Sequence, residues 1–346
     1  MKIKVAILGG SGYTGVELLR ILSNHPYCEV VSVTSRKMAG KKVCDVFPSL
    51  IGYSDLEFVA PSVDHLSKDA EYVFTCVPHQ TAMEVVPSLL DEGLKVIDLS
   101  ADFRIRDKDV YERWYQRHAC PQYLKEAVYG LPELYRDAIS SARLVANPGC
   151  YPTSAILPLV PLLAKGLIDP ETIIVDSKSG TSGAGRGANV ATLFCEVNEG
   201  FKAYKIAKHR HTPEIEQELG VAAGKKIRIN FTPHLVPMSR GILTTIYANT
   251  SGQVGEKDLR GILRSFYENT FFVKVLPEGV FPNVLSVRGT NMCHIGLRLD
   301  ERTGRVILIS AIDNLCKGAS GQAVQNMNIM AGFKEEVGLD RPALYP

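Results

Sequence analysis

The chain has 346 residues, enough for about two domains, and its 45% hydrophobic and 22% charged residues are typical of globular proteins. The net charge of +2 argues neither for nor against a nucleic-acid or membrane partner, whereas one tryptophan and no basic tract argue against nucleic acid. No apolar run reaches the roughly 18 to 20 residues that cross a bilayer. The first predicted strand begins at about residue 2, with no signal-peptide pattern ahead of it.

The eight cysteines contain no C-x-x-C pair, so the sequence indicates neither a zinc site nor a disulfide framework. Reduced thiols in a cytoplasmic enzyme fit this pattern best. His209 and His211 lie two residues apart without an evident third ligand, which is weak evidence for a metal. We expect no metal site.

A dinucleotide fingerprint opens the chain. Residues 2–9 are predicted to form a buried parallel strand and residues 16–22 a helix, with a G-x-G-x-x-G loop between them. Glycines let a backbone approach a pyrophosphate, and the helix N-terminus attracts it. The alternative is a plain tight turn. The predicted cofactor-binding residues of this loop are Gly10, Ser11, Gly12, Tyr13, Thr14 and Gly15.

The second predicted strand, residues 29–34, ends in Ser35 and Arg36. An NAD enzyme would place an acidic residue there, whereas a hydroxyl and a guanidinium suit a 2′-phosphate, so we expect NADP. The alternative is a solvated basic turn. The strand at 71–77 is predicted to place Cys76 and Pro78 at the cofactor edge of the sheet, followed by a helix over 81–92.

Four polar residues alternate at the end of the next predicted strand, which begins at residue 95. If the chain stays extended, Asp98, Ser100, Asp102 and Arg104 share one face. Ser100 is a predicted cofactor contact, and Arg104 a predicted anion-binding residue whose alternative is a surface salt bridge. Residues 106–135 look like an insertion that covers part of a cleft.

Cys150 follows a predicted strand at 142–146 and the turn of Asn147, Pro148 and Gly149, and it precedes a predicted helix at 151–163. A thiol at a helix N-terminus is stabilised as the nucleophilic thiolate. The alternative is a cysteine that packs as a small hydrophobic residue. We expect Thr153 or Ser154 to cap the helix.

Two further segments supply polar groups. The loop at 179–187, after a predicted strand at 172–178, is rich in glycine and hydroxyls and carries Ser182, Gly183 and Arg186, which suits a phosphate or a carboxylate unless it is a flexible linker. His209 and His211 precede a predicted helix at 213–219 that Thr212 would cap, and histidine supplies an acid or base near neutral pH. Their alternative is a solvated loop.

The second half is predicted to be α+β, with a mixed or antiparallel sheet whose open face could bury against a second subunit. Its predicted elements are strands at 227–232, 241–247, 272–276, 293–299 and 305–311 and a helix at 255–270. Asn314 is placed to hydrogen-bond a nicotinamide carboxamide. We expect a Rossmann-type domain at 1–149, completed by a C-terminal helix within 318–346, and a catalytic and oligomerisation domain at 150–317.

Five motifs in combination resemble the N-acetyl-gamma-glutamyl-phosphate reductase family, within the aspartate-semialdehyde dehydrogenase superfamily. They are Gly-Gly-Ser-Gly-Tyr-Thr-Gly at 9–15, Asp-Leu-Ser-Ala-Asp-Phe-Arg at 98–104, Asn-Pro-Gly-Cys-Tyr-Pro-Thr at 147–153, His-Arg-His-Thr-Pro-Glu-Ile at 209–215 and Asp-Asn-Leu-Cys-Lys-Gly at 313–318. The resemblance implies Cys150 as nucleophile, His211 as acid/base, NADP bound by the first loop and Asn314, and a homodimer or homotetramer.

The expected reaction is reduction of an acyl phosphate through a cysteine thioester. Arg104, Asn147, Arg186 and His209 are the predicted substrate- or phosphate-binding residues, and Ser182 and Gly183 complete the predicted cofactor set. One alternative is the lysine-pathway relative that reduces a carrier-linked aminoadipyl phosphate. Another is a non-catalytic NADP-binding regulator with a buried, inert Cys150.

Overall fold

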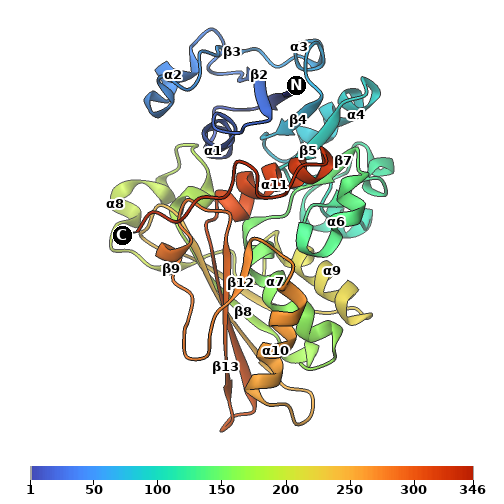
Figure 1. The fold of residues 1–346 in the computed structure, drawn as a ribbon, viewed down its shortest axis with the longest axis vertical. Helices are drawn as coiled ribbons and strands as arrows, with labels where there is room; N and C mark the ends of the chain where they lie inside the picture. Colours follow the sequence, from blue (N-terminus) through green and yellow to red (C-terminus); the bar gives the residue numbers. More distant parts are fainter. Residues whose placement is uncertain (1, 346) are drawn as a thin grey trace. The chain divides into compact units, whose positions relative to one another are not determined.

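A computed structural model describes residues 2–345 of the chain (Figure 1). The chain forms two compact units: unit 1 comprises Met1–Pro148 and Ala319–Asp340, and unit 2 comprises Gly149–Gly318 and Arg341–Pro346. Residues 341–345 therefore group with unit 2. The chain passes from unit 1 to unit 2 between Pro148 and Gly149, one residue before Cys150.

Unit 1 is built on a seven-stranded sheet with the order β3-β2-β1-β4-β5-β7-β6, in which every pair is parallel. The strands are β1 (Ile3–Leu8), β2 (Cys28–Thr34), β3 (Phe58–Val59), β4 (Tyr72–Thr75), β5 (Lys95–Asp98), β6 (Val128–Tyr129) and β7 (Leu144–Ala146). The predicted Rossmann-type sheet is confirmed. Its short central strands are apolar runs because both faces of such a sheet are covered.

The helices of unit 1 include α1 (Tyr13–Leu22), α2 (Val43–Val46), α3 (Val63–Ser67), α4 (Ala82–Asp91), α5 (Lys108–Trp114), α6 (Pro132–Ser140) and α11 (Gly321–Met330). The segment predicted to be an insertion contains α5 and the edge strand β6. Helix α11, from the far end of the chain, packs against α1, α6 and β5 (Figure 1). Its ten residues are all buried, so it completes the core of unit 1.

Unit 2 is built on a second seven-stranded sheet with the order β12-β13-β14-β11-β8-β10-β9. Its strands are β8 (Ile174–Ser179), β9 (Lys202–Ala203), β10 (Asn230–Leu235), β11 (Ile242–Asn249), β12 (Val273–Val275), β13 (Cys293–Asp300) and β14 (Arg305–Ile312). The pairs β8–β10 and β12–β13 are parallel and the other pairs are antiparallel. The predicted α+β fold with a mixed sheet is confirmed.

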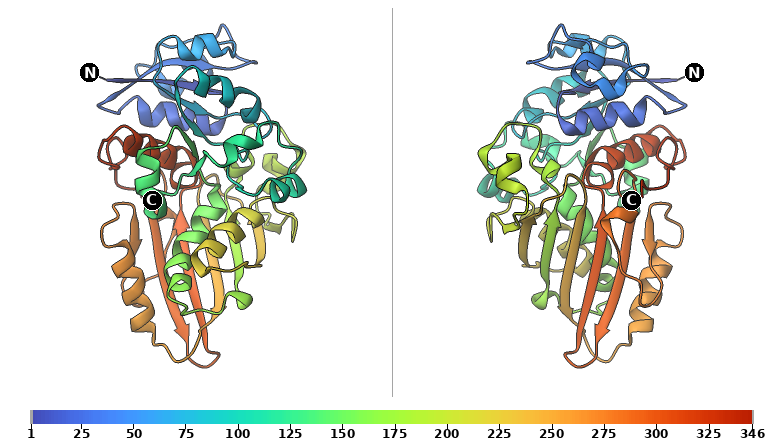
Figure 2. Two further views of the ribbon diagram at one scale, coloured as in Figure 1. Left: turned by 90° about the vertical axis from the view of Figure 1, so that its right-hand side faces the viewer. Right: turned by 90° about the vertical axis from the view of Figure 1, so that its left-hand side faces the viewer.

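Helix α7 (Cys150–Ala164) lies against this sheet together with α9 (Thr212–Ala223) and α10 (Glu256–Tyr267) (Figure 2); the short α8 (Phe194–Val197) precedes β9. Every residue from Tyr151 to Leu163 is buried, as expected for a helix that is apolar all round. The hydroxyls of Ser154 and Thr244 lie 2.7 Å apart, and Ser310 donates to the Ser154 carbonyl at 2.6 Å. These bonds fix the first turns of α7 on β11 and β14.

Two expectations about helix caps were wrong. Helix α7 begins at Cys150 after an extended Gly149, so Thr153 lies inside the first turn and donates to the Gly149 carbonyl at 3.0 Å instead of capping. Ser154 also lies inside the helix. Helix α9 begins at Thr212 itself, with His211 at the N-cap position.

The polar residues after β5 do not share one extended face, because the strand ends at Asp98. The Asp98 carboxylate accepts hydrogen bonds from the Ser100 amide at 3.0 Å and from its hydroxyl at 2.7 Å. An aspartate that bonds the backbone two residues ahead turns the chain. Among residues 2–345, no helix is long and apolar enough to cross a membrane.

Candidate active site

The carboxyl edge of the unit 1 sheet gathers the predicted cofactor residues of this unit. The sheet order reverses between β1 and β4, and ligands of such sheets bind at this switch point, beyond the carboxyl ends of the strands. The glycine loop follows β1, Cys76 and Pro78 follow β4, and Ser100 follows β5. Ser35 follows β2, and its hydroxyl lies 2.8 Å from that of Ser11 in the glycine loop.

The glycines of the first loop fit a dinucleotide in different ways. A β-carbon on Gly10 would lie 2.3 Å from a methyl of Val33, and one on Gly15 would lie 2.3 Å from the Gly10 carbonyl oxygen. Both positions therefore require glycine for packing. A β-carbon on Gly12 would meet nothing within 4 Å, so the loop is open on that side, where α1 begins. An open glycine at a helix N-terminus is the cradle that a pyrophosphate needs.

Cys76 sits directly against this loop. Its amide donates to the Leu8 carbonyl at 2.7 Å, and a β-carbon on Gly9 would lie 2.8 Å from its carbonyl oxygen. Burial raises the pKa of the Cys76 thiol to about 12, so this cysteine stays protonated at neutral pH. Cys76 therefore packs against the glycine loop, and its protonated thiol does not suit a nucleophile.

Arg104 is buried, in contrast to the surface salt bridge that was its alternative. Its Nε donates to the Asn147 carbonyl at 2.7 Å and its Nη2 to the Leu99 carbonyl at 2.8 Å. Asn147 Nδ2 in turn donates to the Ala319 carbonyl at 3.1 Å. These bonds tie the ends of β5 and β7 to the start of the α11 segment.

In unit 2, Cys150 is the first residue of α7 and is partly exposed. The Gly149 amide, one residue earlier, donates to Glu214 Oε1 at 2.8 Å. Glu214 is fully buried in the first turn of α9. This bond ties the start of the cysteine helix to the helix that begins directly after His211.

The two histidines lie within an aromatic cluster beside the start of α7. The ring of Tyr151 lies 5.4 Å from that of His209 and 5.9 Å from that of His211, between centroids. The His211 amide donates to His209 Nδ1 at 3.1 Å, so this nitrogen carries no proton. Burial, with the cations Lys205 and Arg210 nearby, lowers the pKa of His209 to about 4. His209 is therefore neutral at neutral pH.

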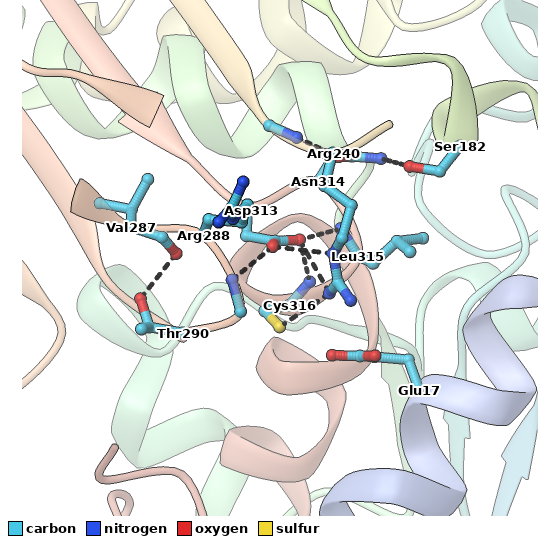
Figure 3. Close-up of polar contacts among 12 residues, drawn as sticks. Glu17, Ser182, Arg240, Val287, Arg288, Thr290, Asp313, Asn314, Leu315 and Cys316 are labelled. Atoms are coloured by element: carbon cyan, nitrogen blue, oxygen red, sulfur yellow. Dashed lines mark hydrogen bonds and ion pairs between the residues drawn. The ribbon is translucent and has the colours of Figure 1, made fainter. Parts of the chain in front are cut away.

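The glycine-rich loop of unit 2 meets Asn314 (Figure 3). Asn314 Nδ2 donates to the Ser182 hydroxyl at 2.9 Å, and its Oδ1 accepts from the Gly241 amide at 2.7 Å. A β-carbon on Gly183 would lie 3.7 Å from Asn314 Nδ2. Three predicted cofactor residues therefore lie together in unit 2, with the Asn314 amide already engaged by protein groups. Arg186, farther along the loop, is exposed.

Comparison with known proteins relates both units to semialdehyde dehydrogenases. A family model described as the semialdehyde dehydrogenase NAD binding domain matches residues 4–142, and one described as the semialdehyde dehydrogenase dimerisation domain matches residues 150–314. N-acetyl-gamma-glutamyl-phosphate reductase from Geobacter sp. (strain M21) is 58% identical over 345 residues, covering 99% of this chain and 100% of that protein. The same-named protein of Pelotomaculum thermopropionicum is 53% identical over 347 residues, covering all of both chains.

The chain belongs to the N-acetyl-gamma-glutamyl-phosphate reductase family. This confirms the resemblance identified from the five motifs. It also confirms the predictions that the chain is an enzyme and that it has a domain for a nicotinamide dinucleotide. Among solved structures, aspartate semialdehyde dehydrogenase II from Vibrio cholerae has a TM-score of 0.73 at 18% identity, covering 96% of this chain and 99% of that one. The Candida albicans enzyme with NADP has a TM-score of 0.70 at 16% identity, covering 97% and 100%. These two structures share the reductase family's fold.

Several residues at the reductase site escaped the sequence analysis. Glu214 and Asp313 were quoted only as members of motifs, without a role. Arg240 was not considered, although it contacts Asp313. The available signal was the position of Asp313 at the end of a predicted strand. Among the described residues 2–345, no cluster of three or more potential metal-ligating side chains occurs.

Proposed function

We propose that the chain reduces N-acetyl-γ-glutamyl phosphate to N-acetyl-L-glutamate 5-semialdehyde with NADPH, releasing phosphate, as a cytoplasmic step of arginine biosynthesis. The name shared by its close relatives supports this reaction. The structural observation that carries the proposal is the bond from the Gly149 amide to Glu214. It ties a thiol at a helix start to a segment that bears two histidines, the pair of groups that covalent acyl transfer requires.

The Cys150 thiolate attacks the γ-carbonyl carbon of the acyl phosphate. A carbon–sulfur bond forms, the carbon–oxygen bond to phosphate breaks, and phosphate leaves with the electron pair, so the acyl group remains on sulfur as a thioester. Helix α7 begins at the nucleophile, and its dipole favours both the thiolate and the developing oxyanion. The amides of its first turn are donors of the kind that stabilise an oxyanion.

Bound NADPH would supply the hydride that reduces the thioester carbon. His211 donates a proton to the resulting alkoxide and later accepts the hydroxyl proton, as the carbon–sulfur bond breaks and the aldehyde leaves. His209 suits this role poorly, because a group with a pKa of about 4 is almost never an imidazolium acid at neutral pH. His209 instead fixes the backbone of His211 through its ring nitrogen.

The cofactor residues proposed in unit 1 follow from the edge that they share. The glycine loop holds the pyrophosphate, and Ser35 and Arg36 hold a 2′-phosphate, which favours NADP over NAD. The bond between Ser11 and Ser35 keeps the two segments at one place. Arg36 is exposed at the end of β2, so replacing it should weaken NADPH binding without disturbing the fold. Cys76, Pro78 and Ser100 line the same edge.

The remaining proposed residues recognise anions or the nicotinamide. Arg104 and Arg186 bind the phosphate and the substrate carboxylate, because a guanidinium binds either group through paired hydrogen bonds. Asn147 and His209 bind the same substrate groups as neutral hydrogen-bonding partners. Ser182, Gly183 and Asn314 contact the nicotinamide end of the cofactor.

We also propose that the enzyme works as a homodimer or homotetramer. The face of the unit 2 sheet opposite to α7 carries half-buried apolar side chains on neighbouring strands, such as Tyr247 and Ile307, which pair directly. The family model for this region is described as a dimerisation domain. A second copy of the chain is the occupant that this face suits, and light scattering after size exclusion would measure the assembly.

The reaction is tested in reverse, by following NADPH absorbance with N-acetylglutamate semialdehyde, NADP and phosphate. We expect phosphate-dependent NADPH formation, and no signal when aspartate semialdehyde replaces the acetylated substrate. Activity with neither substrate, in protein that still binds NADP, would contradict the proposal and favour the carrier-linked aminoadipyl reductase or a regulator.

The two catalytic roles are tested by substitution. Cys150→Ser should abolish turnover and leave NADPH affinity within a few-fold, whereas near-normal turnover would remove Cys150 from the mechanism. His211→Asn should lower kcat by about 10² to 10⁴-fold. A loss of less than about tenfold would transfer the role to another acid, and the matched variant His209→Asn shows whether the neighbouring ring supplies it.

A further inference from the structure

Three loops of unit 2 meet at one end of its sheet, where β8 ends, β11 begins and β14 ends. Ile242, the first residue of β11, pairs with Ser179 on one side and Ile312 on the other. The segment Met238–Gly241, which leads into β11, runs along the glycine-rich loop. The Thr181 amide donates to the Met238 carbonyl at 2.9 Å and the Ser182 amide to the Ser239 carbonyl at 3.1 Å. This segment therefore holds the start of the glycine-rich loop.

Asp313, the first residue after β14, is the centre of this region (Figure 3). Its Oδ2 accepts from Arg240 Nε at 2.9 Å and from the Gly289 amide at 2.7 Å. Its Oδ1 accepts from Arg240 Nη2 at 3.1 Å and from the amides of Leu315 at 2.8 Å and Cys316 at 3.1 Å. Five donors saturate a fully buried carboxylate, which fixes the loop that follows.

Arg240 joins the loops to one another. Its guanidinium forms a two-point ion pair with Asp313, and Nη2 also lies 3.3 Å from the Cys316 sulfur. The next residue, Gly241, donates its amide to Asn314 Oδ1 at 2.7 Å. Arg240 and Gly241 thus hold the consecutive residues Asp313 and Asn314, the first by its side chain and the second by its backbone.

The same loop reaches the proposed nucleophile. The Gly318 amide donates to the Asp313 carbonyl at 3.0 Å, which closes the loop from 313 to 318. A β-carbon on Gly318 would lie 2.8 Å from Cys150 Cβ, so the backbone of this loop abuts Cys150. Residues Cys316–Ser320 form a π-helical turn, a geometry found frequently at functional sites. A continuous set of contacts therefore runs from Arg240 through Asp313 to Cys150.

Stability alone is a weak reason for an ion pair at this place. Burying two charges carries a desolvation penalty that often exceeds their attraction, and well-packed apolar side chains can replace such pairs at no loss. The strands here already pair along their full length with regular register. What the pair adds is a defined position for a loop that contacts both Asn314 and Cys150.

We propose that Arg240 is a positioning residue of the reductase, which sets the 313–318 loop against Cys150 through its ion pair with Asp313. This role rests on the proposed function for its kinetic consequence, because Cys150 is the nucleophile of that reaction. Arg240 contacts neither reacting atoms nor substrate in this role. It acts by fixing the surroundings of the sulfur and the amide of Asn314.

The test compares Arg240→Met and Arg240→Lys with Arg260→Met and Arg260→Lys. Arg260 is a matched control, because it also forms a largely buried ion pair in unit 2, with Glu256 at 2.8 Å. It also bonds the carbonyls of Leu276 and Leu297, which lie outside the 313–318 loop. Lysine keeps the charge but loses the two-point geometry, so it separates charge from positioning.

The first measurement is the alkylation rate of Cys150 by iodoacetamide as a function of pH, followed on the Cys150 peptide by mass spectrometry, with Cys150→Ser as the blank. The second is kcat in the reverse assay. We expect Arg240→Met to change the alkylation rate several-fold and to lower kcat by about 10- to 100-fold, as for other misplacements of about 1 Å. Arg240→Lys should show a smaller effect than Arg240→Met on both the alkylation rate and kcat. The Arg260 variants should keep both quantities within about twofold of wild type.

Equal losses of kcat in the Arg240 and Arg260 variants, with unchanged Cys150 alkylation, would overturn the proposal. If Arg240→Met does not fold, as judged by circular dichroism, the lysine variant decides by the same criteria. Failure of the proposed function is a different result, because wild-type protein would then lack activity on the acetylated substrate. The alkylation comparison needs no substrate, so it would still decide whether Arg240 positions Cys150.

Discussion

Asp102 in unit 1 and Asp313 in unit 2 each fix a loop by accepting hydrogen bonds from it, but they differ in their other partners. Both carboxylates are fully buried, both lie beyond the carboxyl end of a strand, and both collect backbone amides from a loop. Asp102 accepts from the Gln80 amide at 2.9 Å with each oxygen, from the Met83 amide at 3.2 Å and from the Tyr111 hydroxyl at 2.9 Å. These donors are neutral, whereas Asp313 also faces the guanidinium of Arg240.

The difference shows how each unit shapes a loop. In unit 1 the carboxylate holds Gln80 at a φ of 85°, a conformation that is unfavourable for a residue other than glycine. It thereby fixes the turn after β4, beside Cys76 and Pro78. In unit 2 a cation links the carboxylate to a second segment of the chain. Asp102 thus fixes the turn after β4 through neutral donors, whereas Asp313 fixes its loop through backbone amides and a guanidinium from another segment.

The largest expected effect comes from breaking the ion pair. Asp313→Asn removes the carboxylate charge that pairs with the half-buried Arg240, and it turns one acceptor into a donor that faces backbone amides. We expect a loss of about 3 to 5 kcal/mol in the free energy of unfolding, measured by urea titration. A loss below about 1 kcal/mol would mean that the two carboxylates do not differ as described.

The neutral site should be less sensitive. Asp102→Asn keeps the shape of the side chain but loses acceptors for the Gln80 and Met83 amides, at a cost of about 2 to 3 kcal/mol. The same urea titration measures it. A cost larger than that of Asp313→Asn would reverse the order of the two sites.

Because His209 is buried beside Lys205 and Arg210, the free energy of unfolding should decrease at acidic pH. The pKa of His209 is lowered from its ordinary value of 6.5 to about 4, so its contribution to stability is present above pH 6.5 and is lost as the pH falls towards 4. Relative to His209→Gln, the wild type should lose about 2 kcal/mol between pH 7.5 and pH 5. Parallel pH profiles of the two proteins would contradict this expectation.

The smallest expected effect concerns Asp98, a second buried carboxylate close to Asp102. Burial, and then the charge of Asp102, raises the pKa of Asp98 from 3.8 to about 6. A raised folded pKa stabilises below pH 3.8, and the benefit is lost as the pH rises through 6. From pH 5 to 7.5 the wild type should lose about 1 kcal/mol relative to Asp98→Asn. A difference of the opposite sign would exclude this cause.

Local patterns predicted most of the fold. Apolar runs bounded by glycine and polar turns marked the strands, and the spacing of Gly10, Gly12 and Gly15 marked a dinucleotide loop, because both signals lie within a few consecutive residues. The helix that begins at Cys150 was predicted from the preceding turn for the same reason. The chain turns at Asp98 because the carboxylate bonds Ser100, and alternation along the sequence does not reveal that competition.

Contacts between distant residues were beyond the sequence. Gly149 and Glu214 are 65 residues apart, and Arg240 and Asp313 are 73 apart. Which residues meet at such separations depends on the strand order and register of the second sheet, and neither follows from apolar periodicity. The burial of Arg104 was not predicted for the same reason, because its carbonyl partners include Asn147 at the end of another strand.

The close contact between Gly318 and Cys150 restricts which substitutions position 318 can accept. A β-carbon there would lie 2.8 Å from Cys150 Cβ, a separation that real β-carbons essentially never show. Every codon change that replaces this glycine introduces that atom, so the position offers no graded series from mild to severe substitutions. Even alanine, with no charge and no hydrogen-bonding group, should displace the carbon that carries the sulfur of Cys150, the proposed nucleophile. Lineages that drift freely elsewhere in this loop are therefore expected to keep glycine at this one place.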